Sequence, residues 1–541
     1  MRYYVKYILN SKIFLFLFFF VLAILSTYPA FGGHFFKLTM DGQIHLVRFE
    51  SIALSFKHLT LPPMVNFMGF GNIGEVFTAT YPWISELIFI LPLALLGNPI
   101  FAIKIGFVLL SFITIINAYL LSKELTKRPL IQIIGVFIYQ FNSYHMIILY
   151  ARNAIGEGVA YAFLPLVLLG WILILKNTGW KGIIAFSFGL GMVINSHIIT
   201  AFYTCLFIAV GLALSILYRK VNGKIVRNFV YSIVLTLLVS IFTIANLLIV
   251  LLNNKLATAG KGFGTSQLSD VINASLNNYI GDKVSFWNIG LISLILLFVL
   301  FAKAICIKQN DNWKMYIYFA MGTFLFTLSW LESIDNYLGK TILGNIQFSS
   351  RLLSFVMLFL EAALVLYLDS YSSKYNLKKI EILICSCTFC LSVLGVKGFH
   401  YVKNDDPIRY YLTSTNYEST IEKPNSGWSD YILVDSEKQP LIKMNDPKLK
   451  DITRVTYDSI NYSFHSNRRE KYKIPLLFYR GINYSINGKK IKATGKPIFI
   501  IAEHGNNSIT VSSKAPAINY LLLTVSLITI VFLSSLVVIK L

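Results

Sequence analysis

The amino-acid sequence predicts a mainly α-helical protein that crosses a membrane about twelve times and carries one β-rich domain outside the membrane, before its last helix. Of the 541 residues, 55% are apolar and only 14% are charged, which leaves too little polar surface to cover a water-soluble globule. Most apolar residues fall into runs long enough to span a bilayer, and one long polar stretch separates the last run from the others.

The net charge of +22 does not indicate a nucleic-acid-binding protein. Such proteins gather Lys and Arg on one folded face, whereas here many of these residues separate the apolar runs. The sequence also predicts no disulfide framework, because the cysteines all lie in or beside apolar runs. Cys385, Cys387 and Cys390 fall within one apolar helix, where packed or lipid-facing thiols are a better interpretation than metal ligands.

The membrane-spanning helices are predicted from length and hydrophobicity. A bilayer core about 30 Å thick requires roughly 17 to 25 mostly apolar residues per helix. The runs that qualify are 13–31, 99–122, 129–148, 158–176, 182–198, 199–218, 228–252, 286–303, 315–331, 350–369, 380–397 and 518–539.

The orientation of these helices is predicted from the basic residues, since short cytoplasmic loops hold an excess of Lys and Arg. If the N-terminus is cytoplasmic, the segments on that side carry nineteen basic residues and only two acids, Glu124 and Asp311. We therefore expect a multi-pass cell-membrane protein with both termini in the cytoplasm. The first run is interpreted as a retained anchor rather than a cleaved signal peptide, because no small-x-small cleavage site follows it.

One further apolar segment, YPWISELIFILPLALLGNP at 81–99, is about as long as a span but contains Pro82 and Pro92 before its final Asn98-Pro99. Counting it as a crossing would invert every later loop. We therefore expect it to lie along the outer membrane face or to dip partway into the membrane. The first outer loop then covers residues 32–98, and loops of this length are often functional.

Inside that loop, Asp41, His45 and Arg48 fall at i, i+4 and i+7 of a predicted helix and share one face. An acid, an imidazole and a guanidinium beside a membrane can bind an anionic lipid head group and remove a proton next to it. The alternative is an interfacial amphipathic helix whose charges meet water and phospholipid.

Further polar residues are predicted where other spans reach the outer face. Ionisable residues at membrane depth are costly, and they usually face a bundle interior, a partner or a water-filled cavity. Each has a structural alternative, such as an ion pair, a lysine that reaches up to the interface, or a hydrogen-bonded turn residue. Their occurrence at one level favours a common site. They are Lys104, Arg152, Glu157, Ser196, His197, Gln347 and Arg351.

Several of these residues also carry a resemblance to a known family. DGQIHLVRFE from Asp41, YPW at 81–83, RNAIGE at 152–157, SH at 196–197 and QFSSR at 347–351 resemble, in order and spacing, the YfhO-like and 6-pyruvoyl-tetrahydropterin synthase-related bacterial membrane proteins. Those proteins belong to the GT-C superfamily of polyprenyl-phosphate-sugar-dependent glycosyltransferases. The resemblance covers most of the chain.

The resemblance implies a glycosyltransferase in which Asp41 is the catalytic carboxylate. It also implies contacts to the donor phosphate or the substrate from His45, Arg48, Lys104, Arg152, Glu157, His197, Gln347 and Arg351. The donor would be a polyprenyl-phosphate-linked sugar, and the acceptor a cell-envelope glycan or a polymer of the teichoic-acid type. Many members carry a second acid after the first, whereas here Gly42 follows, so the involvement of a divalent metal ion stays open.

The polar segment at 398–516 is predicted to be a β-rich domain outside the membrane, between a transmembrane module at 1–397 and a last helix at 517–541. YILVD, ITRVTY, INYSFH and IFIIAEHG favour strands, and NSGWSD, KMNDPK and SINGKK favour turns. This domain could grip an anionic or glycan acceptor with Tyr479 and Arg480, or only cap the transmembrane cavity.

Two other classes of function remain after this comparison. A transporter of a lipid-linked precursor or a small solute usually shows repeated halves with broken helices at the midplane, and the sequence shows no such repeat. A noncatalytic membrane scaffold would not require the carboxylate of Asp41.

Overall fold

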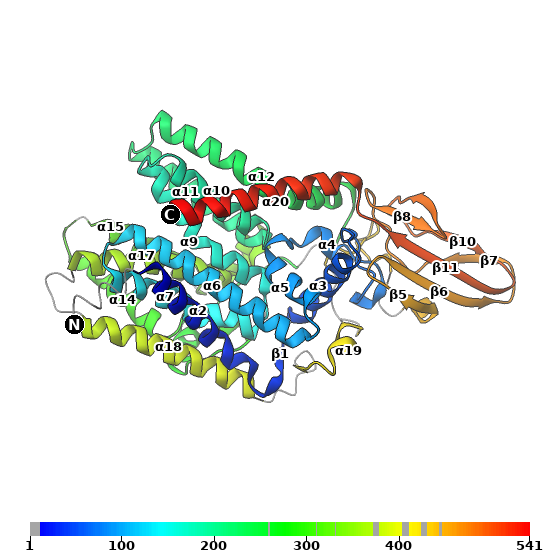
Figure 1. The fold of residues 1–541 in the computed structure, drawn as a ribbon, viewed down its shortest axis with the longest axis horizontal. Coiled ribbons are helices and arrows are strands. Elements are labelled where there is room, and N and C mark those ends of the chain that lie inside the picture. Colours follow the sequence, from blue (N-terminus) through cyan, green and yellow to red (C-terminus); the bar gives the residue numbers. More distant parts are fainter. Residues whose placement is uncertain are drawn as a thin grey trace.

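The computed structural model describes residues 11–541, except 258–259, 310, 330–331, 372–377, 403–409, 423–429 and 443–445. The predicted turn NSGWSD, apart from its last residue, and the first half of the predicted turn KMNDPK lie in the last two of these gaps, outside the described residues. A helical bundle forms most of the molecule, and a group of strands extends from one of its ends (Figure 1). We call this end of the bundle the sheet end.

Eight helices in the described part of the chain are long and apolar enough to cross a membrane. A ninth span results if α7 and its continuation are counted together, although they bend by 46° at a short break. The eight are α2 (Lys12–Thr27, extended by the turn η1, Tyr28–His34), α6 (Pro99–Leu125), α9 (Ile155–Leu175), α11 (Ile198–Leu217), α12 (Gly223–Asn253), α17 (Leu353–Tyr371), α18 (Lys378–Tyr401) and α20 (Ala517–Lys540). The bent pair is α7 (Pro129–Gln140) with α8 (Ser143–Met146) and η4 (Ile147–Ala151).

The remaining three predicted spans correspond to shorter helices, α10 (Trp180–Ile194), α14 (Leu291–Cys306) and α15 (Asn312–Phe326). They contain 15, 16 and 15 residues. At about 1.5 Å per residue, each is shorter than a bilayer core of about 30 Å. The structure therefore supports a multi-pass helical membrane protein with eight or nine full-length spans among the described residues, and it does not confirm the predicted count of twelve.

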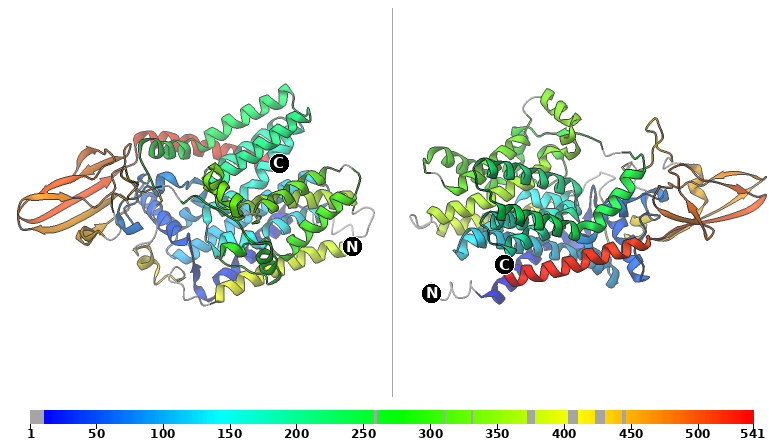
Figure 2. Two further views of the ribbon diagram at one scale, coloured as in Figure 1. Left: turned by 180° about the vertical axis from the view of Figure 1, so that it is seen from behind. Right: turned by 90° about the horizontal axis from the view of Figure 1, so that it is seen from above.

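The interior of the bundle is formed by α9 and α17, whose apolar windows are 89% and 83% buried. Helices α6 and α10 pack against α9, and α7 and α15 pack against α17. The last helix, α20, runs from the strands back along the bundle beside α12 (Figures 1 and 2). The segment predicted at 81–99 forms a short apolar helix, α5 (Leu87–Leu95), after the turn η3 (Ile84–Glu86).

The strands beyond the bundle form a five-stranded antiparallel sheet in the order β5-β6-β11-β8-β9. These strands are β5 (Ile452–Val455), β6 (Ser459–Ser466), β8 (Asn483–Ile486), β9 (Lys489–Lys492) and β11 (Gly505–Ser513), and a separate pair is formed by β7 (Glu470–Lys473) and β10 (Phe499–Ala502). The predicted turn SINGKK joins β8 to β9, where Asn487 and Gly488 have φ angles of 48° and 79°. Two consecutive positive φ angles are typical of the tight hairpin turn that Asn-Gly favours.

Shorter elements connect the long helices and the strands. In the first loop, α3 (Gly42–Lys57) follows β1 (Phe36–Leu38), which pairs with β4 (Tyr410–Leu412) from the far part of the chain. The others are η2 (Phe70–Asn72), α4 (Phe77–Thr80), β2 (Phe263–Gly264), α13 (Leu268–Leu276), η5 (Val284–Phe286), α16 (Glu332–Lys340), η6 (Ile342–Ile346), β3 (Gln347–Phe348), η7 (Ser349–Leu352), α19 (Tyr417–Glu422) and η8 (Pro447–Asp451).

The first loop and the sheet share one hydrophobic core. Val65, Phe67 and Ile73 of the loop are buried in the same cluster as Ile460 and Leu476. The N–H of Leu477 also donates to the carbonyl of Ile73 at 2.8 Å. Burial of apolar surface on both sides fixes the sheet to the loop that leads into α5.

Glu75 lies in this shared core, fully buried, and neither of its carboxylate oxygens has a hydrogen-bond partner in the described part of the chain. Burial raises the pKa of Glu75 well above its usual value, and the nearby Asp430 raises it further. The folded chain therefore binds a proton more tightly at this carboxyl than the unfolded chain does. That contribution to stability is complete below the unfolded pKa and is lost as the pH rises through the folded pKa.

Replacing Glu75 by Gln removes this dependence of stability on pH. Relative to the variant, we expect the free energy of unfolding of the native chain to fall by up to about 1.4 kcal/mol per pH unit as the pH rises between the two pKa values. Thermal unfolding of both chains at about pH 5 and about pH 9 measures the difference. An equal shift in both chains would contradict a buried, unpaired carboxyl.

Candidate functional site

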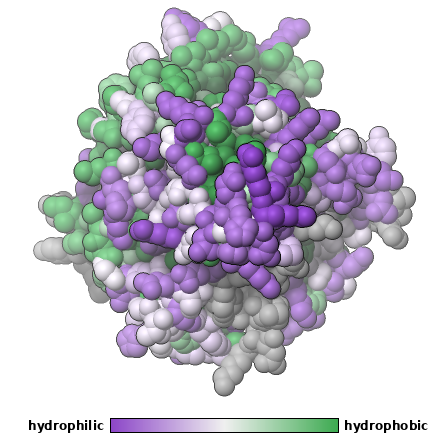
Figure 3. All heavy atoms as spheres, turned by 90° about the vertical axis from the view of Figure 1, so that its right-hand side faces the viewer, coloured by the Kyte–Doolittle hydropathy of each residue, from purple (hydrophilic) through white to green (hydrophobic). Residues whose placement is uncertain are grey.

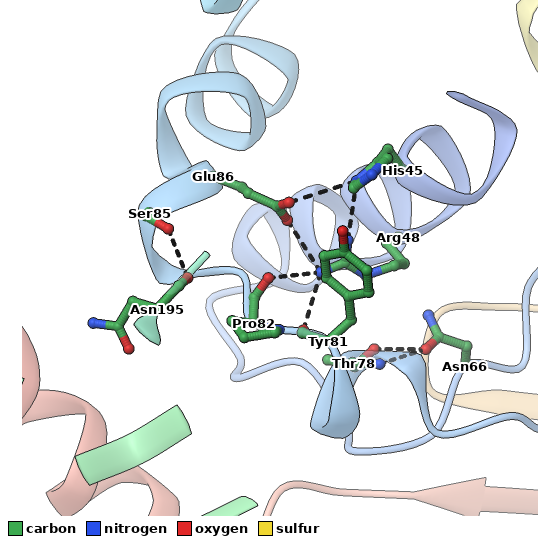
Figure 4. Close-up of polar contacts among 9 residues, drawn as sticks. All are labelled: His45, Arg48, Asn66, Thr78, Tyr81, Pro82, Ser85, Glu86 and Asn195. Carbon is green, nitrogen blue, oxygen red and sulfur yellow. Dashed lines mark hydrogen bonds and ion pairs between the residues drawn. The ribbon is translucent and has the colours of Figure 1, made fainter. Parts of the chain in front are cut away.

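A buried arginine holds together the turn that begins at Tyr81. Arg48 on α3 pairs with Glu86 at 3.0 Å, and the same nitrogen, Nη2, donates to the carbonyls of Tyr81 and Pro82 at 3.0 and 2.9 Å. The guanidinium lies 4.3 Å from the centre of the Tyr81 ring. His45 lies 3.2 Å from Arg48 and 3.5 Å from Glu86 through Nδ1 (Figure 4). We call these five residues the Arg48 clamp.

The clamp makes Arg48 a structural residue, because its side chain is fully buried and paired within the loop. His45 is buried beside it, and burial together with the charge of Arg48 lowers the pKa of His45 well below its usual value. The imidazole is therefore neutral at physiological pH.

Removing one partner of the Arg48–Glu86 pair leaves the other as a buried unpaired charge. We expect Arg48→Met to destabilise the chain by about 3–5 kcal/mol, because breaking a buried pair is far more costly than replacing both partners. The double variant Arg48→Met/Glu86→Leu should recover part of this loss, since no buried charge remains. Thermal unfolding of the purified chains makes the comparison, and a double variant less stable than Arg48→Met would refute this account of the clamp.

Asp41 lies immediately before α3, where the first loop meets the end of η4. Its N–H donates to the carbonyl of Arg152 at 3.1 Å. Thr39 donates through its N–H to Oδ1 of Asn153 at 2.8 Å and through its hydroxyl to the carbonyl of Ala151 at 2.8 Å. A Cβ at Gly42 would lie 2.6 Å from the same Oδ1 of Asn153, so a second acid after Asp41 would not fit without a local shift.

Arg152 and Arg351 converge on one carboxylate. Nη1 of Arg152 lies 2.8 Å from Oε2 of Glu157, and Nε of Arg351 lies 3.4 Å from the same oxygen. The hydroxyl of Tyr144 donates to the other oxygen at 2.8 Å. Two guanidinium groups thus share one carboxylate, and this group of residues keeps a net positive charge. Such an arrangement can accept a further anion.

The backbone around both arginines is irregular. A single π-helical turn, η4, precedes Arg152, whose N–H donates to the carbonyl five residues earlier, at Ile147. Gln347 has a φ of 65°, and its side-chain oxygen accepts a hydrogen bond from Arg351 at 2.9 Å. π turns and non-glycine residues with positive φ are enriched at functional sites.

The carboxylate of Asp41 has no hydrogen-bond or ion-pair partner in the described part of the chain, although Arg152 and Arg351 are near enough to act on it electrostatically. Burial raises the pKa of Asp41 above its usual value, while Arg152 and Arg351 oppose this rise. A carboxylate with a raised pKa and free oxygens is a better proton acceptor than an ordinary aspartate.

Tyr81 extends the site toward the turn between α10 and α11. Its ring lies between His45, at 5.3 Å, and His197, at 6.2 Å between ring centres. A Cβ at Gly156 would lie 2.6 Å from the Tyr81 hydroxyl, which places this hydroxyl at the start of α9. We define the Asp41 site as Asp41, Tyr81, Arg152, Glu157, His197 and Arg351.

The structure thus brings most of the sequence-predicted residues together. Gln347 borders the Asp41 site through Arg351, and His45 borders it through Tyr81. Arg48 belongs to the clamp instead. Lys104 also lies apart, with its ammonium group 5.1 and 5.9 Å from the ring centres of Tyr28 and Phe31.

Sequence reasoning missed two residues of this region. The sequence predicts Tyr81 only as the start of an interfacial segment and not as a site residue, although the YPW motif is part of the family resemblance. Asp430 raises the pKa of Glu75, and Asp41 in turn raises the pKa of Asp430, and nothing in the local sequence of Asp430 signals this. Among the described residues, no three His, Cys, Asp or Glu side chains gather in a group that could hold a metal ion.

Comparisons with known proteins find structural similarity, which is weak for the protein described here. No protein-family model and no curated protein sequence matches the chain. The crystal structure of the Archaeoglobus fulgidus oligosaccharyltransferase in its apo form aligns with 79% of this chain and 61% of that protein, at 11% sequence identity and a TM-score of 0.34. The aligned part is thus about three fifths of the length of that protein, and similarity at this level does not establish a shared fold.

Proposed function

We propose that this chain is a membrane glycosyltransferase that moves a sugar from a polyprenyl-phosphate donor to an acceptor in the cell envelope, with Asp41 as the base. The observation that carries the proposal is the carboxylate of Asp41, unpaired among the described residues, beside Arg152 and Arg351, which share the carboxylate of Glu157. A phosphate group and a nucleophilic hydroxyl are the two ligands that such a site needs side by side.

The reaction requires few protein groups. The acceptor hydroxyl oxygen attacks the anomeric carbon of the sugar, its proton passes to Asp41, and the bond between the anomeric carbon and the phosphate oxygen breaks. Polyprenyl phosphate leaves with the bonding electrons. Arg152 and Arg351 stabilise the negative charge that develops on the phosphate, and the Tyr81 hydroxyl and His197 border the same space.

A cavity of about 1100 Å³ between α11 and α15 suits the lipid tail. Its walls include Leu206, Phe207 and Phe319. It extends along α11 from Tyr203 to Tyr218, a distance of about 22 Å at 1.5 Å per residue. Leu352, the residue after Arg351, lines the same cavity. A tail in this cavity would place its phosphate near the Asp41 site.

The proposal includes an orientation, with the sheet end outside the cell and both termini in the cytoplasm, because a flipped lipid-linked sugar is presented at the outer face. In a chain with its five cysteines replaced, we expect Lys57→Cys and Lys471→Cys to react with a membrane-impermeant thiol reagent in whole cells. Lys224→Cys, at the start of α12, should stay unlabelled. Labelling of Lys224→Cys alone would reverse the orientation.

The sequence suggests that Tyr479 and Arg480 of the β-rich domain could contact the acceptor, and the structure places the two residues differently. Tyr479 is fully buried and donates its hydroxyl to the carbonyl of Tyr431 at 3.1 Å, which makes it a core residue. Arg480 is exposed; its N–H donates to Asn254 just after α12, and its side chain donates through Nε to the carbonyl of Thr494 at 2.5 Å. In this proposal the domain positions the first loop through their shared core.

One observation favours transport as a second candidate. Glu361 is fully buried on α17, ten residues from Arg351 and thus about 15 Å deeper in the bundle. One of its oxygens accepts from Ser122 at 3.0 Å, and the other has no partner among the described residues. Buried carboxyls at this depth are common in proton relays of pumps and transporters.

The proposal is tested by sugar transfer in membranes. Membranes that contain this chain should transfer label from a radiolabelled polyprenyl-phosphate sugar to envelope material, and membranes with the Asp41→Asn form should do so at least about 10²-fold more slowly. Equal transfer by both would remove the catalytic assignment of Asp41.

A further inference from the structure

A second polar cavity lies where the sheet meets the membrane-spanning helices. It has a volume of about 1000 Å³ and lies between the β8–β9 hairpin, the end of α12 at Asn253 and the residues that precede α20. Two hydrogen bonds fix this junction. The N–H of Arg480 donates to Oδ1 of Asn254 at 2.8 Å, and Nδ2 of Asn254 donates to the carbonyl of Arg480 at 3.1 Å.

The cavity carries a concentrated positive charge. Arg480, Lys490, Lys492 and Lys514 line it, and none of the described lining residues is acidic. Lys490 and Lys492 are two positions apart on β9, so their side chains leave the same face of the strand. Lysines on an edge strand also prevent unwanted pairing, but Arg480 and Lys514 lie outside that strand and converge on the same space.

The position of the cavity indicates what kind of anion it meets. Helix α12 ends at Asn253 and α20 begins at Ala517, so the cavity lies at the level where these helices leave the membrane. Below it, the last turn of α12 exposes Leu251 and Leu252, and the first turn of α20 exposes Ile518. Apolar side chains this exposed beside a basic cavity are typical of a surface covered by lipid.

The distribution of side chains on the surface of the sheet end supports a membrane boundary at this level. In Figure 3 hydrophilic side chains cover much of this surface, and hydrophobic surface appears along its upper and left-hand sides and in a patch near its centre. Tyr520 is 51% exposed on the first turns of α20, where aromatic residues commonly mark the boundary between lipid and water.

We infer that this cavity binds the head group of an anionic glycerophospholipid from the leaflet at the sheet end. The phosphodiester lies among Arg480, Lys490, Lys492 and Lys514, and the acyl chains follow the exposed leucines of α12 and Ile518 of α20. The bound lipid bridges the sheet and two membrane-spanning helices at their junction. This lipid site is separate from the Asp41 site. It does not depend on the proposed glycosyl transfer.

The test compares two triple variants of the full chain in lipid nanodiscs. One carries Lys490→Gln, Lys492→Gln and Lys514→Gln. The control carries Lys471→Gln, Lys489→Gln and Lys496→Gln, which removes the same charge from exposed positions outside the cavity. Phosphatidylglycerol is titrated into phosphatidylcholine discs, and the lipid retained per chain is measured by native mass spectrometry.

We expect the cavity variant to bind phosphatidylglycerol roughly tenfold to a hundredfold more weakly, since each basic residue near an anionic lipid surface contributes substantially to binding. The control and the native chain should bind alike. Equal binding by all three chains would overturn the inference, as would equally tight binding of phosphatidylcholine. Displacement of the lipid by a soluble poly(glycerol phosphate) at equal phosphate concentration would instead assign the cavity to a polymer, which also overturns the inference.

A second measurement needs only the native chain. A phosphatidylglycerol analogue with a photoreactive head group should cross-link to residues 480–485, 490–494 and 514–515. Cross-links confined to other segments would contradict the site even if the triple variant fails to fold.

Discussion

Asp41→Asn should lower the rate of glycosyl transfer roughly 10²- to 10⁴-fold, the usual contribution of a general base. Asn has nearly the shape of Asp but does not accept a proton at neutral pH. The carboxylate has no structural partner in the described part of the chain, so its replacement should leave the amount of inserted protein nearly unchanged. The measurement is transfer per unit of inserted protein.

A matched control lies on α3, the helix that follows Asp41. Glu50→Gln removes one negative charge from α3, and its remaining carbonyl oxygen can still accept the hydrogen bond that Tyr417 donates at 3.0 Å. This variant should transfer sugar at the native rate. Asp41→Glu keeps the charge but moves it by about one methylene, so it should recover little activity if position matters. Glu75 is unsuitable as a control because its burial makes any replacement affect stability.

The pH dependence of glycosyl transfer follows from the protonation of Asp41. The base must be deprotonated, and burial raises the pKa of Asp41. Transfer should therefore fall on the acid side at a higher pH than an ordinary aspartate, with a pKa of about 3.9, would give. The residual activity of Asp41→Asn should not show this fall in rate at low pH, whereas the activity of Glu50→Gln should show it.

Arg351→Gln is expected to have the second-largest effect, a loss of roughly 10²- to 10³-fold, similar to the removal of one preorganised donor to a developing negative charge. Arg351 suits this test because its side chain is 12% exposed, whereas that of Arg152 is only 2% exposed. Gln keeps a hydrogen-bond donor but no charge, and Arg152 still pairs with Glu157. The native amount of folded protein should therefore remain.

Lys104→Gln provides the matched control for this arginine. It removes one positive charge from the same end of the bundle, but Lys104 lies over aromatic rings and away from Glu157. We expect at least half of the native transfer rate in this variant, measured at saturating donor. If Lys104→Gln and Arg351→Gln lose activity equally, the donor phosphate does not lie where we place it.

The sequence could predict that residues from distant segments meet at one end of the bundle. Helices that cross a membrane must begin and end at its two faces, so polar residues at alternate ends of successive spans share one level. Arg152, His197 and Arg351 follow this rule, and each lies at the sheet end. The helix after Asp41 was likewise predictable from its periodicity.

The pairing of individual side chains was not predictable in the same way. Arg48 shares a helical face with Asp41 and His45, but a partner 38 residues away, Glu86, determines its role. Lys104 lies at the expected depth yet meets aromatic rings. The lengths of α10, α14 and α15 also differ from the predicted spans, because an apolar run shows hydrophobicity but not where the backbone leaves the helix.

The most direct test of the central claim uses the purified chain in liposomes that contain one of a panel of polyprenyl-phosphate sugars. The measurement is the release of free polyprenyl phosphate together with the transfer of label to added envelope acceptor. We predict that both products form with the native chain and that both form at least about 10²-fold more slowly with Asp41→Asn. Movement of intact donor across the bilayer without release of polyprenyl phosphate would contradict the claim and identify the chain as a transporter.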